Sequence, residues 1–259
     1  MNTWIAWKLL KLVSLVVLAG GVFGAMTTEV RGRRIAMTYG YTVPGLAGTW
    51  TAGWLMMKEQ GVSVTAPWIL AAIAASTASL HGAFVLSHRP VIRPIAPILA
   101  VGGLFGAVAL MVARPLGGWM VGALVAGGLL VAIPLSFAGR APARTEDTDA
   151  QWVVRGFRWV AWGEGATLLF LLLVTMPLKY LAGVDIQLGT GWIGWLHGVF
   201  VVVYVQSLAS TAHFFGWSWR RWATGFLAAL LPAGTFVFER AVTRHPTHRA
   251  GGGAPSAQK

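Results

Sequence analysis

The chain has 259 residues, of which 56% are hydrophobic and only 11% are charged, and its mean hydropathy is +0.66. Soluble domains average about 25% charged residues, so this composition excludes an ordinary soluble domain and indicates a polytopic membrane protein. The formal charge is +12, but the basic residues lie mostly in short loops between apolar runs, so we expect a lipid bilayer and no nucleic acid as partner.

A helix that crosses a bilayer needs about 20 mainly apolar residues. Eight stretches meet this requirement, so the predicted fold class is all-α, a polytopic membrane bundle of about eight transmembrane helices. In chain order the predicted spans are 4–26, 36–57, 66–87, 94–113, 118–138, 159–176, 192–214 and 222–238. The second span is weakened by Gly40, Pro44, Gly45 and Gly48, although neighbouring helices can satisfy a broken backbone inside a bundle.

The polar stretch between the fifth and sixth spans contains Pro142 and an acidic run at 146–149, which predicts a boundary. The predicted organisation is a five-helix membrane region at 1–139, a polar linker at 140–157, a three-helix membrane domain at 158–240 and a basic tail at 241–259. The tail is predicted to be disordered because Gly, Ala, Pro and Ser dominate it. A tight helical hairpin is expected at 114–117.

Basic residues in short loops predict the orientation, because cytoplasmic loops carry an excess of Lys and Arg. With eight spans, the interior loops on one side receive only Lys58, Arg114 and Lys179. The other side receives Arg31, Arg33, Arg34, Arg89, Arg93, Arg140, Arg144, Arg155, Arg158, Arg220 and Arg221. That side is predicted to be cytoplasmic in a bacterial inner membrane, with both termini outside.

Small residues recur four positions apart on two predicted helices. Gly102 and Gly106 form one stripe, and Ala71, Ala75 and Ser79 form the other. Such stripes let helix backbones approach closely in lipid. We expect packing within the chain, with homo-oligomerisation as the alternative.

Glu164 is the acidic residue that falls well inside a predicted span. A charge at the bilayer centre costs roughly 2.5 to 3.5 kcal/mol, so such a residue is expected to have a partner or a task. On the antiparallel next span, Gln206, Ser207 and Ser210 lie at similar depth and can donate to it. Glu164 therefore ties two helices, or relays a proton or contacts a substrate, or lies near the headgroups if the register differs.

Lys179 and Tyr180 follow Pro177, which is expected to end or kink the helix. The lysine can reach lipid phosphates while the tyrosine joins the interfacial belt, so both are predicted to be membrane anchors. Binding of a lipid headgroup or an anionic solute is the alternative. At a rise of 1.5 Å per residue, Glu164 and Lys179 lie about 22 Å apart, too far for one compact site.

His197 lies about one and a half turns into the seventh span, and Gly198 beside it is expected to admit a close neighbour. A histidine in a span can ligate haem or a metal, relay protons or form a hydrogen bond to another helix, and the last is favoured for His197 and His81. By depth, Glu164 is expected toward the cytoplasmic leaflet, and Lys179, Tyr180 and His197 toward the outer one.

Catalytic and metal-binding signatures are missing from the sequence. There is no cysteine, no His and carboxylate cluster with metal spacing, no phosphate loop, no GxSxG elbow and no HExxH. We therefore predict no catalytic residue, no metal and no cofactor.

A set of motifs carries a resemblance to a known family. Besides Arg158, Tyr204 and Phe238-Glu239-Arg240, these are Glu164-Gly165, Pro177-Leu178-Lys179-Tyr180 and His197-Gly198. Together they resemble a family of small bacterial integral membrane proteins, filed as a domain of unknown function, with EG, PLKY and HG motifs. The resemblance covers about residues 152–242 and implies a three-helix membrane unit without an assigned activity.

Three functional hypotheses remain. The favoured one is a non-enzymatic component or assembly partner of a larger bacterial envelope complex, because packing motifs and interfacial aromatics abound. The second is a small-solute or proton-coupled transporter or channel that uses Glu164, Lys179 and His197. The third is a b-type haem redox subunit.

Overall fold

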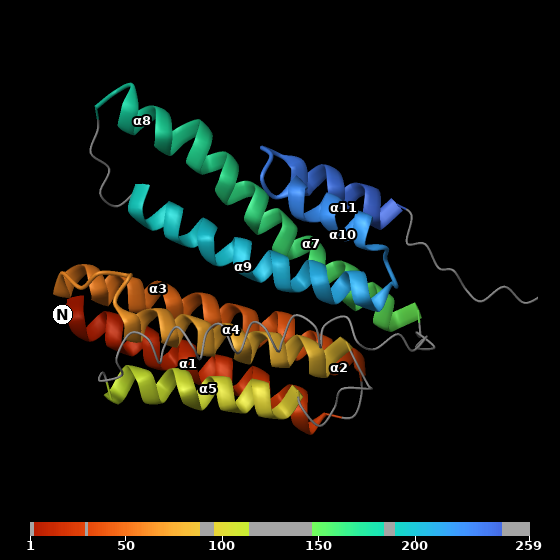
Figure 1. The fold of residues 1–259 in the computed structure, drawn as a ribbon, viewed down its shortest axis with the longest axis horizontal. Coiled ribbons are helices and arrows are strands. Elements are labelled where there is room, and N and C mark those ends of the chain that lie inside the picture. The colour runs from red at the N-terminus through yellow and green to blue at the C-terminus, as the bar shows by residue number, and fades with distance from the viewer. Residues whose placement is uncertain (1–2, 29–30, 89–95, 114–146, 184–189, 245–259) are drawn as a thin grey trace, which may run out of the picture.

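The computed structural model describes residues 3–28, 31–88, 96–113, 147–183 and 190–244 (Figure 1). Within these ranges the chain is helical and contains no strand, which confirms the all-α fold class. The elements are α1 (Thr3–Thr27), α2 (Arg31–Met37), η1 (Thr38–Thr42), α3 (Val43–Gln60), α4 (Pro67–His88), α5 (Ala96–Ala113), α7 (Asp147–Phe170), η2 (Leu171–Thr175), α8 (Met176–Tyr180), α9 (Thr190–Phe214), α10 (Trp219–Ala228) and α11 (Gly234–Arg244).

Four helical stretches in the described residues are long and apolar enough to cross a membrane. They are Thr3–Thr27, Pro67–Ser87, Asp149–Tyr180 and Gly191–Phe214, which match the first, third, sixth and seventh predicted spans. The predicted span 36–57 lies within the helical run from α2 to α3, and the described part of the predicted span 94–113 is α5, but neither is among the four. The predicted span 118–138 and the hairpin at 114–117 lie outside the described residues, so the count of eight is not confirmed.

The domain boundaries stay a prediction, although one helix starts earlier than expected. α7 begins at Asp147, inside the stretch expected to be a polar linker. The tail that is predicted to be disordered, 241–259, lies mostly outside the described residues, and its first four residues are helical because α11 ends at Arg244.

The predicted span 222–238 is wrong as a single helix, because the chain folds back on itself between α10 and α11. Pro232 has no N–H to continue a helix, and Ala233 adopts a left-handed φ of 62°. Gly234 then lies against the carbonyl group of Ala228, too close for any Cβ. Helices of 10 and 11 residues are about 15 and 16 Å long, half of a hydrocarbon core of about 30 Å. We call α10, α11 and their turn the C-terminal hairpin.

Two short π-helical segments allow long helices to continue past prolines. η1 and η2 each end two residues before a proline, Pro44 and Pro177 respectively. In an α-helix, a proline ring clashes with the carbonyl group four residues earlier, and a wider π turn makes room for it. The run from Asp147 therefore continues past Pro177 to Tyr180 and does not end there.

Glycines bring the N-terminal helices into backbone contact. A Cβ at Gly45 of α3 would fall on the backbone nitrogen of Leu18 in α1 and 2.6 Å from its Cα. A Cβ at Gly103 of α5 would lie 2.5 Å from the carbonyl oxygen of Ala75 in α4. The small residues of α4 therefore pack within the chain, as predicted. On α5 the close contact with α4 is at Gly103, whereas a Cβ at Gly102 would meet nothing within 4 Å.

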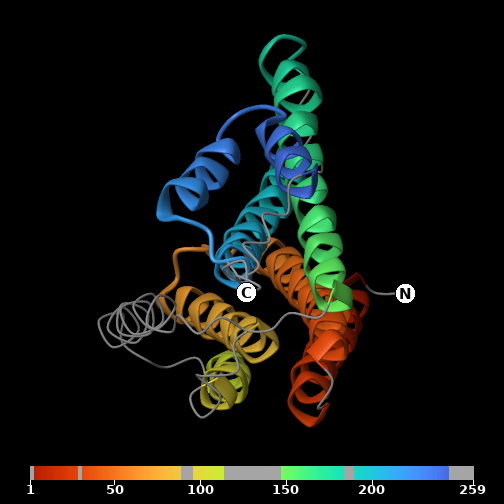
Figure 2. The ribbon, with the colours of Figure 1, turned by 90° about the vertical axis from the view of Figure 1, so that its right-hand side faces the viewer.

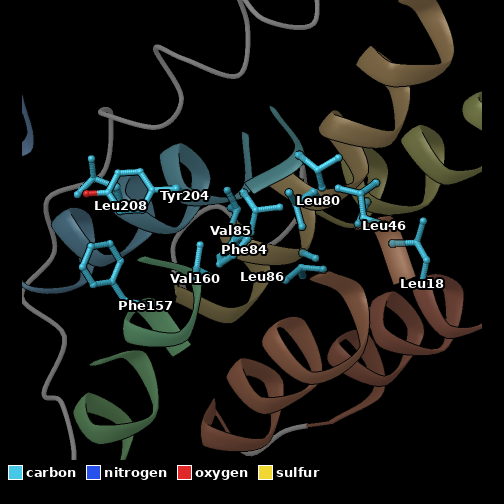
Figure 3. Close-up of a cluster of buried hydrophobic side chains, with 14 of the residues drawn as sticks. Leu18, Leu46, Leu80, Phe84, Val85, Leu86, Phe157, Val160, Tyr204 and Leu208 are labelled. Carbon is cyan, nitrogen blue, oxygen red and sulfur yellow. The ribbon is translucent and has the colours of Figure 1, made fainter. Parts of the chain in front are cut away.

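The helices lie in layers around the antiparallel pair α7 and α9. The N-terminal helices pack on one side of this pair and the C-terminal hairpin on the other (Figures 1 and 2). A buried apolar core runs through these layers and includes Leu46, Phe84, Phe157 and Tyr204 (Figure 3). α9 is the central element, since it contacts helices of both sides.

Polar contacts fasten the C-terminal hairpin to the pair. Arg158 Nε of α7 forms an ion pair with Glu239 Oε1 of α11 at 2.6 Å, and Trp162 Nε1 donates to Glu239 Oε2 at 3.5 Å. The hydroxyl group of Tyr204 in α9 donates to the carbonyl oxygen of Gly225 in α10 at 2.9 Å. The hairpin is therefore held by both helices of the pair.

We predict that Gly45→Ala lowers the free energy of unfolding by about 1–3 kcal/mol, because overpacking forces α1 and α3 apart. Gly53→Ala in the same helix is the matched control, since its Cβ meets nothing within 4 Å. Alanine improves helix propensity there by about 1 kcal/mol, so the control is expected to gain stability. Denaturation of the purified protein in detergent measures both; a destabilisation shared equally by the two variants contradicts the packing.

We also predict that Arg158→Gln loosens the hairpin more than Glu239→Gln does. Loss of the arginine leaves the Glu239 carboxylate, whose side chain is 3% exposed, with the long contact from Trp162, whereas Arg158 is 46% exposed and can turn to water or headgroups. Stranding a buried acceptor costs about 1–3 kcal/mol, toward the low end here because the arginine side is open. Hydrogen exchange of the α11 amides measures the difference, and equal effects of the two variants count against it.

Candidate functional site

Glu164 is the centre of the candidate site. Its side chain on α7 is fully buried, and neither carboxyl oxygen has a hydrogen-bond partner among the described residues. Of the buried side chains that lack a partner there, it is the one ionisable group. Buried polar groups are nearly always hydrogen-bonded, so an exception of this kind calls for an explanation such as a bound ion, water or a functional role.

The α9 residues predicted to donate to Glu164 form other contacts. Ser207 bonds to the hydroxyl group of Tyr39 at 2.8 Å, and Gln206 Oε1 lies 2.8 Å from His81 Nδ1. Both contacts reach the N-terminal helices. The expected pairing of Glu164 with Gln206, Ser207 or Ser210 is wrong, because neither of its carboxyl oxygens has a partner among the described residues. The interhelical hydrogen bond predicted for His81 is confirmed.

The tip of the C-terminal hairpin reaches the site instead. Thr235, the second residue of α11, places its hydroxyl group 2.6 Å from where a Cβ of Gly165 would be. This hydroxyl is buried and lies beside the Glu164 carboxyl group, but with a geometry that forms no hydrogen bond. The first turn of a helix has backbone N–H groups without helical partners and a partial positive charge. Glu164 thus lies near the N-terminus of α11, where Thr235 is buried.

His197 joins the site through Thr167. The Thr167 hydroxyl donates to the carbonyl oxygen of Glu164 at 2.9 Å and lies 3.3 Å from His197 Nδ1. A hydroxyl group has one proton, so Nδ1 is the donor toward Thr167 whenever Thr167 donates to the carbonyl oxygen. The interhelical hydrogen bond predicted for His197 is present. His197 therefore lies about one helical turn from Glu164 along α7. The leaflet that holds each group stays a prediction.

The other predicted site residues do not join this group. A Cβ at Gly198 would meet nothing within 4 Å, so Gly198 admits no close neighbour, contrary to expectation. Lys179 Nζ lies 5.3 Å from the ring centroid of Tyr180, and the tyrosine is 69% exposed. Both belong to α8, at the far end of the long helix from the C-terminal hairpin (Figure 1). Their role as anchors stays a prediction, and they share no site with Glu164.

The length of the α7–α8 run indicates the depth of each group. The candidate span Asp149–Tyr180 has 32 residues, or about 48 Å, against a hydrocarbon core of about 30 Å. If Lys179 and Tyr180 mark one interface, counting about 20 residues back places the other near Val160. Glu164 then lies about 6 Å inside the hydrocarbon, and Arg158 lies among the headgroups.

Reasoning from the sequence missed Thr235 and Thr167. Thr235 lies inside the predicted span 222–238. Pro232 and Gly234, two residues apart, are a turn signal that predicts the hairpin instead. Thr167 carried no such signal, because its role depends on the register between α7 and α9.

Metal-ligating side chains do not gather around the site. Among the residues that the structure describes, no three His, Asp or Glu side chains come together in a way that suits a metal ion.

Comparison with known proteins places the site within a family. The model of a domain of unknown function, DUF3817, matches residues 154–244. An uncharacterized membrane protein, YdzA of Bacillus subtilis (strain 168), is 37% identical over 82 residues, which are 32% of this chain and 83% of that protein. No solved structure matches.

The matched region contains α8 to α11 and all of α7 from its second turn onward, and with them Glu164, His197 and Thr235. The predicted family resemblance over 152–242 is therefore confirmed, and so is a membrane protein of unknown activity. The chain belongs to the DUF3817 family of domains of unknown function through its C-terminal helices.

Proposed function

We propose that this chain is a multi-pass protein of the bacterial inner membrane that moves protons, alone or coupled to a small solute, with Glu164 as the proton-binding group. The observation that supports this proposal is the buried carboxyl group of Glu164, which has no hydrogen-bond partner in the part of the chain that the structure describes. An unpaired buried carboxylate costs several kcal/mol, so the group holds a proton at rest. It can ionise only when a partner or water reaches it.

The surroundings of Glu164 supply a way to stabilise the ionised form. The N-terminus of α11 and the Thr235 hydroxyl approach from the hairpin, and a small shift of either would provide donors to the carboxylate. Broken or half-length helices with their N-termini inside the membrane are a recurrent element of transporter sites. His197 lies one turn away and offers a second titratable group.

We expect Glu164→Gln to reduce proton uptake into liposomes at least tenfold, because glutamine cannot carry the proton. The full-length protein is reconstituted, a potassium diffusion potential is applied, and an internal pH dye reports the flux. Glu164→Asp is expected to keep part of the flux. Lys179→Gln is the matched control, because Lys179 lies at the far end of the helix, and its flux is expected to equal that of the wild type. Undiminished flux in Glu164→Gln rejects the proposal.

A second candidate function is a non-enzymatic assembly component of a larger envelope complex. It is favoured by the way α9 binds the N-terminal helices, through the Tyr39–Ser207 and His81–Gln206 contacts and the stacking of Trp54 on Trp195. The 82 matched residues make up 83% of YdzA, which leaves no room there for helices equivalent to α1–α5. In such a protein the same face of α9 would be free for another membrane protein.

This candidate predicts that fragments 1–146 and 147–259, expressed together, purify as one complex. Gln206→Leu is expected to weaken the association, because it leaves His81 without its partner across the interface. Leu227→Ala on the outer side of the hairpin, where the leucine is 57% exposed, is the control and is expected to have no effect. Fragments that never associate, although each inserts in the membrane, count against a helix-binding role.

A further inference from the structure

A groove opens between the N-terminal helices and α7, on a side of the protein that Glu164 does not reach. Its volume is about 610 Å³, and the first residues to line it come from α2 and η1, among them Tyr39 and Gly40. α7 contributes Trp152, Arg155 and Trp159, and α9 contributes Phe200. We call this cavity the lateral groove.

Two glycines of α7 allow aromatic rings of the groove lining to pack against the helix backbone. Gly156 and Gly163 lie two turns apart on one face of the helix. A Cβ at Gly156 would fall on the ring of Tyr39, and a Cβ at Gly163 would fall on the ring of Phe200. The two aromatic rings therefore lie directly against the backbone of α7, and both line the groove. An apolar cavity built this way fits a flexible hydrocarbon chain.

The rim of the groove has the composition of a membrane interface. Trp152, Trp159 and Trp162 all line it and are 43%, 68% and 48% exposed. Tryptophans of this kind gather at the level of the headgroups. This agrees with the helix count that places the interface near Val160.

Arg155 is the basic residue among those that line the groove. Its guanidinium carbon lies 5.3 Å from the ring centroid of Trp152. None of the lining residues is acidic. Asp149, the acidic residue that packs against Gly32 nearby, is not part of the lining and is 9% exposed. The groove thus combines an apolar interior with a cation at headgroup depth.

We propose that the lateral groove is a binding site for one anionic phospholipid, with an acyl chain in the groove and the phosphate on Arg155. The volume lies within the range of roughly 300–1,000 Å³ that is usual for small-molecule sites, which fits one lipid and not a second transmembrane helix. Basic pockets between membrane helices on the cytoplasmic side characteristically bind anionic headgroups. The proposal is independent of proton binding at Glu164.

Native mass spectrometry of the full-length protein tests the site with two probes that have identical acyl chains, phosphatidylglycerol and phosphatidylethanolamine. One Arg near an anionic headgroup is expected to favour the anionic lipid about fivefold. Arg155→Gln is expected to abolish this preference, and Arg155→Lys to keep it. Arg220→Gln is the matched control, an exposed arginine of α10 outside the groove, and is expected to keep the preference.

A second variant tests the cavity and not the charge. Gly40→Leu adds a side chain in the lining at a position where a Cβ meets nothing within 4 Å, so the fold is expected to survive while both lipids lose this site. Gly194→Leu on α9 is its control, since that position is equally open and does not line the groove. Equal retention of the two lipids by the wild type overturns the proposal, as does an unchanged preference in Arg155→Gln. A cross-linker at Trp159 that captures a protein segment in place of lipid also overturns it.

Discussion

The antiparallel contact between α7 and α9 is the interaction on which the rest of the structure depends. Phe157 and Tyr204 are both fully buried and meet there, with ring centroids 5.6 Å apart. The N-terminal helices pack on one side of the pair and the C-terminal hairpin on the other. In lipid there is no hydrophobic force between helices, so close packing and interhelical hydrogen bonds must hold these layers together. The pair supplies both kinds of contact to both sides.

Glu164 has no hydrogen-bond partner among the described residues, although polar side chains lie on the neighbouring helix α9. Ser207 and Gln206 of α9 contact Tyr39 and His81 of the N-terminal helices. The hairpin uses the Arg158–Glu239 ion pair and the Tyr204 hydroxyl group for its attachment. These polar groups hold the helices together on both sides of the pair. The carboxyl group of Glu164 takes part in none of these contacts. The proposed proton binding rests on this buried carboxyl group.

Sequence reasoning succeeded where the property is local. Apolar length predicted the helices at 4–26, 66–87 and 192–214 to within a few residues of the observed ends. It failed at 222–238, where total apolarity outweighed the turn signal of Pro232 and Gly234. It also failed to place His197 beside Thr167. The relative register of α7 and α9 depends on how the two helices pack, which the apolar length of each helix does not specify.

The sequence by itself determined that this chain is helical, that it belongs in a membrane and that its C-terminal helices carry the family resemblance. These properties follow from composition, from the length of apolar runs and from motifs, all of which are written along the chain. Only the tertiary structure decided which polar groups meet, bringing Glu164, His197 and Thr235 together and leaving Lys179 and Gly198 apart. The physical reason is that a hydrogen bond between helices depends on their rotation and register, which the close contacts at glycines and the turn of the hairpin fix.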